Sequence, residues 1–213
     1  MTATRTASVL DLALNTLQLG GAPILKDIHL SVPKGQTLAL VGPSGVGKSS
    51  LLRIIAGLET SYQGRCTVAG KSAIVFQEPT LLPWRSTRDN ICIATGVTPA
   101  VADTALADVG LQDRGDAYPN RLSLGQQRRL SLARAFAVQP DLLLMDEPFV
   151  SLDPALVGEM MQLFKTLQTA HDVTTILVTH VQKEAQALAD RIITLAGKPA
   201  TISSDILGSA PTQ

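Results

Sequence analysis

The chain has 213 residues, of which 45% are hydrophobic and 17% are charged, so its composition excludes an intrinsically disordered protein. Eighteen basic and eighteen acidic residues leave no net charge, which disfavours a dedicated nucleic-acid-binding protein. Two cysteines, Cys66 and Cys92, are too few for a disulfide scaffold and are expected to pack as thiols in a reducing compartment. The sequence contains neither an apolar run long enough to cross a membrane nor a signal-peptide pattern, so we expect a cytoplasmic protein.

Short apolar runs alternate with helical patterns along the chain, which predicts an α/β fold with a parallel sheet. The first two segments, 9–19 and 24–32, alternate like antiparallel strands. The segment 36–41 (QTLALV) then reads as a buried strand, and a helix is expected over 48–56, closed by Gly57. Further buried strands are predicted at 142–145, 175–179 and 191–195.

The middle segment, 86–138, lacks long β-branched runs and is predicted to be a helical lobe. We expect one domain over 1–213, with this lobe inserted into a core formed by 1–85 and 139–202. Residues 203–213 are expected to form a small, polar tail of poor order.

Two helix starts can be read from local chemistry. Ser123 followed by Gln126 is a capping box, and the helix it begins should end near 138 because Pro140 disfavours helix at the preceding residue. Asp153 before Pro154 is a good start for a second helix. Its predicted buried stripe is Leu156, Met160, Leu163 and Leu167.

Residues 42–49 read GPSGVGKS, which matches the whole phosphate-loop pattern between a predicted strand and a predicted helix. Glycines let the backbone curl until several N–H groups point at phosphate oxygens, and the helix start adds partial positive charge. Lys48 would reach the β- and γ-phosphates, and Ser49 would ligate Mg²⁺. The predicted nucleotide-binding set is Gly42, Pro43, Ser44, Gly45, Val46, Gly47, Lys48, Ser49 and Ser50.

An acid pair follows the apolar run 142–145. Carboxylates at the C-terminal end of a strand lie where α/β folds place their ligands. Asp146 would hold Mg²⁺ through water, and Glu147 would polarise a water that attacks the γ-phosphate. The plainer interpretation is a helix cap or turn, and the phosphate loop makes it less favourable.

From about residue 9 to 202 the sequence resembles the ATP-binding cassette (ABC) ATPases. Gln77 after the apolar IVF is similar to the family's Q-loop, and LSLGQQRR at 122–129 is similar to its signature. DEP at 146–148 resembles the Walker B acids, and SLD at 151–153 resembles the D-loop. His180 after a strand resembles the switch histidine. The resemblance implies a P-loop NTPase core with a parallel sheet, an N-terminal antiparallel β subdomain and an inserted helical subdomain.

The resemblance also implies roles for individual residues. The catalytic set would be Glu147, Lys48, His180 and Gln77, and Gln77 would join Ser49 and Asp146 on Mg²⁺. A second cassette would be needed to complete each ATP site, through its Ser123, Gly125, Gln126 and Asp153. Each residue has a plainer reading beside this one, since Ser123 and Asp153 can simply cap helices.

The segment 76–91 (FQEPTLLPWRSTRDNI) most resembles the importers of nitrate, sulfonate and taurine. Its apolar patch, 81–84 (LLPW), would receive a coupling helix from a membrane subunit, although local packing is the alternative. The resemblance therefore implies an ATPase peripheral on the inner face of the membrane. Its partners would be a second cassette in a homodimer, permease subunits and a solute-binding protein, without nucleic acid.

Three features depart from the family pattern. Leu19 stands where an aromatic ring usually stacks on adenine, Leu124 replaces the first signature glycine, and 64–76 is short. Two alternatives therefore stay open: a soluble ABC ATPase acting on nucleic acid or ribosomes, and a degenerate cassette that mainly binds nucleotide. An ATPase assay of the isolated chain, with and without partner subunits, would separate these alternatives.

Overall fold

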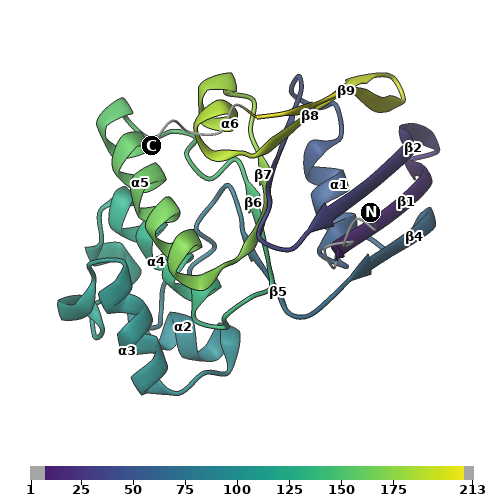
Figure 1. The fold of residues 1–213 in the computed structure, drawn as a ribbon. Helices are drawn as coiled ribbons and strands as arrows, with labels where there is room; N and C mark the ends of the chain where they lie inside the picture. The colour runs from purple at the N-terminus through teal and green to yellow at the C-terminus, as the bar shows by residue number, and fades with distance from the viewer. Residues whose placement is uncertain (1–7, 209–213) are drawn as a thin grey trace, which may run out of the picture. The chain divides into compact units, whose positions relative to one another are not determined.

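A computed structural model describes residues 8–208, and the chain within it divides into two compact units (Figure 1). Of the described residues, the first unit holds 8–72, 141–147 and 173–208, and the second holds 73–140 and 148–172. The second unit therefore contains the segment 86–138 that was predicted to be helical, together with one further long helix. Strand β5 (Ser72–Val75) crosses from one unit to the other.

The first unit is built on a mixed sheet, whose strands follow the order β4-β1-β2-β9-β8-β3-β7-β6. Strand β3 pairs in parallel with β7 and β8, and β6 pairs in parallel with β7, whereas β1 is antiparallel to β2 and β4. This confirms the α/β fold and the antiparallel N-terminal part. The strands are β1 (Ser8–Leu19), β2 (Ala22–Pro33), β3 (Thr37–Val41), β4 (Tyr62–Val68), β6 (Leu142–Asp146), β7 (Thr174–Val178), β8 (Arg191–Gly197) and β9 (Ala200–Leu207).

The two kinds of strand differ in burial as their sequences predict. Every residue of β3 and β7 is buried, as is usual for parallel strands covered on both faces. In β1 the residues Leu10, Leu12 and Leu14 are buried, while Asp11 between them is exposed. The antiparallel part therefore has one face on the core and one face in solvent.

Two helices of the first unit pack on its sheet. Helix α1 (Lys48–Ile55) buries Leu51, Leu52, Ile54 and Ile55, and it is followed by Gly57 at φ +70°. Helix α6 (Gln182–Leu188) contributes Ala185 to a core cluster with Ala39, Val41, Ala189 and Ile192. Both helices begin beyond the C-terminal ends of parallel strands.

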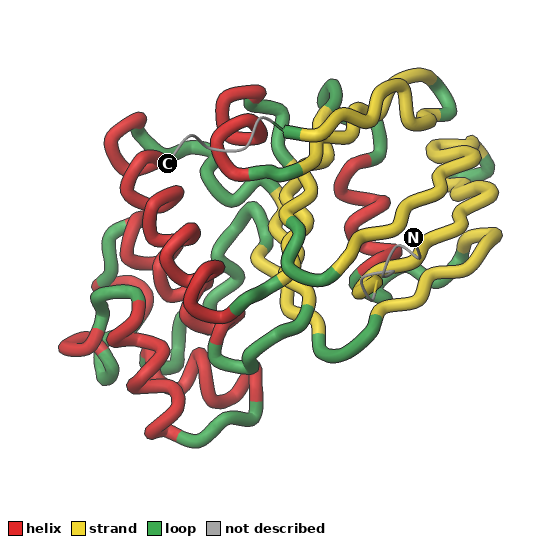
Figure 2. The backbone as a smooth tube through the Cα atoms, in the orientation of Figure 1, coloured by secondary structure: helices red, strands yellow, loops and turns green. Residues whose placement is uncertain are grey.

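The second unit is mainly helical (Figure 2). Its helices begin where capping chemistry predicts, because Ser123 and Gln126 form both bonds of a capping box and Asp153 accepts bonds from the amides of 155 and 156. The elements are α2 (Thr87–Thr95), α3 (Pro99–Asp108), the 3-10 turns Gln112–Arg114 and Pro119–Arg121, α4 (Leu124–Phe136) and α5 (Pro154–His171). Among the described residues no single helix has the length and hydropathy to cross a membrane, and α2 with α3 meets that test only as a pair bent by 118°.

Two details of the sequence prediction need correction. The buried residues of α5 are Met160, Phe164 and Leu167. Leu156 and Leu163, both predicted to be buried, are half-buried, and Phe164 takes the place predicted for Leu163. Helix α4 ends at Phe136, two residues before the predicted end.

The expected polar tail is also wrong over 203–207, because this segment belongs to β9. It pairs antiparallel with β8, where Ile193 lies opposite Asp205. The Asp205 carboxylate accepts two bonds from the guanidinium of Arg191, at 2.8 and 2.6 Å. Backbone pairing and this ion pair order the segment, although its apolar residues Ile206 and Leu207 are 52% and 81% exposed and so gain little from burial. Residues 209–213 of the predicted tail lie outside the described part of the chain.

Candidate nucleotide-binding site

The phosphate loop joins β3 to α1, and its backbone shape depends on glycine. Gly42 has φ +149° and Gly47 has φ +109°. A Cβ atom at Gly42 would lie 2.5 Å from the carbonyl oxygen of Leu195, and one at Gly47 would lie 2.6 Å from Cδ2 of Leu25. Both positions exclude a side chain for reasons of space as well as of dihedral angle.

Replacing Gly47 with alanine should therefore destabilise the protein. We expect the free energy of unfolding to fall by about 2–5 kcal/mol, since a left-handed dihedral costs about 1–2 kcal/mol and overpacking about 1–3 kcal/mol. Gly45 is a matched control, because it has φ +74° but open space around its Cα atom. Urea unfolding of G47A and G45A measures the difference, and equal stability of the two variants would contradict the steric argument.

Lys48 and the start of α1 present positive charge within this loop. The Lys48 side chain is only 4% exposed, and its Nζ donates to the carbonyls of Gly42 at 2.8 Å and Pro43 at 3.0 Å. Helix α1 has no side-chain cap and no acidic residue in its first turn. Its first amide groups are therefore free to bind an anion, which fits a phosphate chain.

Ser49 and Asp146 come together beside the loop. The Ser49 hydroxyl donates to Oδ1 of Asp146 at 2.9 Å. Burial raises the pKa of Asp146, and the bond from Ser49 opposes this shift. A hydroxyl and one carboxylate suit Mg²⁺, which takes its other ligands from water and substrate phosphates. The described residues hold no group of three or more His, Cys, Asp or Glu that could bind a metal unaided.

Glu147 and His180 form a second pair at the same edge of the sheet. Nδ1 of His180 lies 3.1 Å from Oε2 of Glu147. Glu147 has a left-handed backbone, with φ +46°, and its amide donates to the carbonyl of Val178 at 2.9 Å. Because β3, β6 and β7 are parallel neighbours, the phosphate loop, the acid pair and His180 all follow strand ends at one edge.

The remaining predicted residues belong to the second unit. Gln77 is exposed, and its backbone carbonyl accepts a bond from the guanidinium of Arg128. Ser123 and Gly125 lie at the start of α4, where a Cβ atom on Gly125 would come within 3.0 Å of the Leu156 side chain. Leu124, the unusual signature residue, is 44% exposed.

Sequence reasoning missed two buried charged residues. Glu184 in α6 accepts a bond from the hydroxyl of Thr179, and that same hydroxyl oxygen accepts a bond from the Val181 amide at 3.0 Å. Burial raises the pKa of Glu184. The two bonds fix the turn that carries His180. Arg128 in α4 is the second missed residue: it is buried, and in the sequence it stood out only as part of the segment 122–129.

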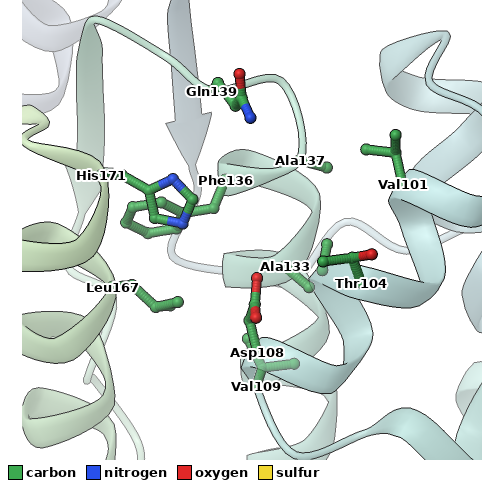
Figure 3. A pocket seen from close by; sticks show the side chains of 11 residues that line it. Val101, Thr104, Asp108, Val109, Ala133, Phe136, Ala137, Gln139, Leu167 and His171 are labelled. Carbon is green, nitrogen blue, oxygen red and sulfur yellow. The ribbon is translucent and has the colours of Figure 1, made fainter.

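A cavity of about 160 Å³ lies in the second unit among α3, α4 and α5 (Figure 3). The ring of His171 lies over that of Phe136, with centroids 5.2 Å apart. The residues that line the cavity include Asp108 and Gln139 but none of the predicted nucleotide-site residues. His171 thus packs against an aromatic ring of the second unit.

A phosphate loop between a parallel strand and a helix, with a hydroxyl–carboxylate pair beside it, defines a P-loop nucleoside triphosphatase. The profile of the family described as "ABC transporter" matches residues 25–150, which is more than half of the chain. The chain belongs to this family, as an ATP-hydrolysing cassette of the branch that the sequence analysis identified.

Relatives and solved structures agree with this assignment. The aliphatic sulfonates import ATP-binding protein SsuB of Mycobacterium avium is 46% identical over 183 residues, covering 83% of this chain and 73% of that protein. SsuB 1 of Pseudomonas savastanoi pv. phaseolicola is 37% identical, covering 93% and 85%.

Two solved structures share the fold. One is the ATP-binding cassette MJ0796 as a dimer in a post-hydrolysis state with ADP and Pi, with a TM-score of 0.81 and 27% identity over 94% of this chain and 99% of that one. The other is cbiO1 from Clostridium perfringens, part of the ABC transporter complex cbiONQ, with a TM-score of 0.82 and 25% identity over 93% and 88%.

Proposed function

We propose that this chain hydrolyses ATP to drive import of an aliphatic sulfonate or a related small anion through partner membrane subunits. The observation that carries the ATPase part is the uncapped start of α1 beside the buried Lys48 ammonium. The solute class is supported by the names of relatives at 46% and 37% identity. Zero net charge gives no support to the alternative of a nucleic-acid or ribosome-directed ATPase.

In this proposal the loop amides and Lys48 bind the β- and γ-phosphates of ATP. Ser49 and Asp146 hold magnesium, and Gln77 offers its amide oxygen to the metal or to the attacking water. Bound magnesium would neutralise part of the phosphate charge. Glu147 orients a water in line with the γ-phosphorus and accepts its proton, while His180 contacts the γ-phosphate.

A second copy of the chain completes each site in this proposal. Ser123, Gly125 and Gln126 of one copy approach the γ-phosphate bound by the other, with the start of α4 adding positive partial charge. Asp153 lies at the interface between the copies. The dimeric cassette with ADP and Pi supports a dimer, and we propose a homodimer.

The membrane partner is proposed to contact the apolar patch 81–84. Trp84 in this patch is 68% exposed, and Leu81 and Leu82 are half-buried. A large exposed aromatic side chain beside other apolar groups is typical of a partner surface. We propose permease subunits there, a separate solute-binding protein, and a place on the cytoplasmic face of the membrane.

The test is co-expression of the chain with a candidate permease and a candidate solute-binding protein chosen from neighbouring genes. We expect magnesium-dependent ATPase activity that rises when the loaded solute-binding protein is added to vesicles containing the complex. A folded chain without magnesium-dependent affinity for any nucleoside triphosphate would refute the ATPase. Salt-sensitive binding of DNA or RNA would favour the alternative instead.

Adding an aromatic ring at Leu19 should strengthen nucleotide binding. Leu19 is 45% exposed at the end of β1, before a hairpin turn made by Gly20 at φ +58° and Gly21 at φ +81°. A ring there could stack on a base, which is worth about 1–3 kcal/mol. We expect Leu19→Tyr to bind ATP about 5–100-fold more tightly than the wild type.

Equilibrium titration with ATP and GTP measures this gain for Leu19→Tyr. Leu58→Tyr is the matched control, since Leu58 is also exposed but lies beyond the end of α1. An equal gain in both variants, or none at Leu19, would contradict the stacking argument.

A further inference from the structure

Side chains on one face of α4 form hydrogen bonds with the backbone of the segment 77–80. Three side chains spaced by three residues, Arg128, Ser131 and Arg134, donate to carbonyls of this segment. Arg128 bonds the carbonyl of Gln77, and Ser131 bonds that of residue 79 at 3.2 Å. Arg134 bonds the carbonyls of residues 79 and 80, both at 2.9 Å.

Arg128 also reaches a second segment. Its Nη2 donates to the carbonyl of Val150 at 3.3 Å, one residue before Ser151, which has φ +63°. Asp153 follows two residues later as the cap of α5. A single guanidinium therefore joins the loop of Gln77, the loop before Asp153 and the helix that begins after Ser123.

The environment of Arg128 is costly for a cation. The residue is only 6% exposed, its Nε is buried without a hydrogen-bond partner, and burial lowers its pKa. Its bonds within the described residues go to carbonyl oxygens and not to carboxylates. The charge of Glu78 partly opposes this pKa shift, but a guanidinium buried mainly among carbonyl groups is still a poor source of stability, so its geometry needs another explanation.

We propose that Arg128 is a positioning residue that attaches the loop of Gln77 and the loop before Asp153 to helix α4. This inference rests on the proposed function, in which Gln77 serves the metal or the water and Ser123 serves the partner copy's ATP. The guanidinium of arginine carries donors on separate nitrogens in one plane and so reaches carbonyls that lie apart, whereas the three donors of an ammonium share one nitrogen. Ser131 and Arg134 extend the same attachment to residue 80, directly before the apolar patch 81–84.

One consequence is mechanical. A partner that presses on the patch 81–84 acts on a segment tied at several points to α4. The start of α4, with Ser123, then moves together with that segment. Arg128 would thus connect the proposed membrane contact to the residues that complete the second copy's site.

The test compares Arg128→Gln with the neighbouring Arg129→Gln. Arg129 donates to the carbonyl of Val109 and to Glu159, both at 3.2 Å, so it bonds other segments. We measure ATP affinity, turnover, the Mg²⁺ concentration for half-maximal activity, and amide hydrogen exchange of peptides covering 76–84.

For Arg128→Gln we expect ATP affinity within about twofold of the wild type, because the phosphate loop is untouched. Turnover should fall about tenfold or more, more Mg²⁺ should be needed, and exchange over 76–84 should be about tenfold faster. Arg128→Lys should recover part of the turnover, and Arg129→Gln should stay within about twofold of the wild type.

Wild-type turnover, Mg²⁺ dependence and exchange in folded Arg128→Gln would overturn the inference, as would an equal loss in Arg129→Gln. If Arg128→Gln does not fold, Arg134→Gln replaces it, since this change removes bonds to residues 79 and 80 only. Unchanged exchange over 76–84 in that variant would overturn the inference. Hydrogen exchange needs no turnover, so an inactive wild type would refute the proposed function and leave this test intact.

Discussion

Replacing Glu147 with glutamine is expected to slow ATP hydrolysis by about 10²–10⁴-fold, because an amide cannot accept the proton of the attacking water. ATP affinity should stay within about twofold, since the phosphate loop and Lys48 are unchanged. Oε2 of Glu147 lies 3.1 Å from Nδ1 of His180, and both residues follow strand ends at the sheet edge that carries the phosphate loop, where the proposed attacking water would bind. Single-turnover hydrolysis and equilibrium ATP binding measure the two effects separately.

The isosteric change keeps the shape of the side chain, so folding should be unaffected. Glu59→Gln is a control in the same unit, because Glu59 bonds only the amide of Ser61 in the described structure. Its turnover should match the wild type. Normal turnover in Glu147→Gln would remove Glu147 from the role of base and point to another group, such as His180.

The parts of the site that follow from local chemistry could be predicted from the sequence. The loop 42–49 matches a pattern whose glycines are required by backbone geometry, and the structure gives Gly47 a φ of +109° with no room for a side chain. Ser123 and Asp153 cap their helices because capping acts within four residues of the helix start. These features can be predicted from the sequence because the interacting residues are close together along the chain.

The parts that depend on distant partners could not be predicted. Nothing in the sequence near Glu147 indicates its left-handed backbone, which accompanies a bond to Val178 in another strand. Strand β9 continues to Leu207 through pairing with β8 and the ion pair of Asp205 with Arg191. Arg128 appeared only as part of a motif, since its partners at 77 and 150 are 51 and 22 residues away.

The choice of Phe164 over Leu163 shows a limit of the periodicity argument. A spacing of three or four residues allows either neighbour to complete a stripe with Met160 and Leu167. The larger aromatic side chain buries more apolar area, and Phe164 is fully buried in the structure. The helix was predicted correctly, but its rotation about its own axis depended on the surface it packs against.

Lys48→Met is the variant with the largest expected effect on ATP binding. Within residues 8–208 the buried ammonium bonds carbonyls of its own loop alone, so an incoming phosphate chain can take over a donor that is already in place. A hydrogen bond between charged groups is worth about 1.5–3 kcal/mol, so losing one or two such bonds predicts about 10–10⁴-fold weaker ATP binding. Methionine preserves the apolar stem, so the melting temperature should change far less than after Gly47→Ala.

The control for this variant is Lys71→Met, which removes an exposed ammonium outside the loop while leaving the Lys71 amide bond to Asp141 intact. Its ATP affinity should equal that of the wild type at each salt concentration. If Lys48→Met and Lys71→Met bound ATP equally well, binding would depend on general positive charge, and the position of Lys48 beneath the curled loop would have no special role. If only Lys48→Met loses affinity, the loss belongs to a single ammonium held where the phosphate chain must lie, which is the arrangement that β3, the glycines and α1 create together.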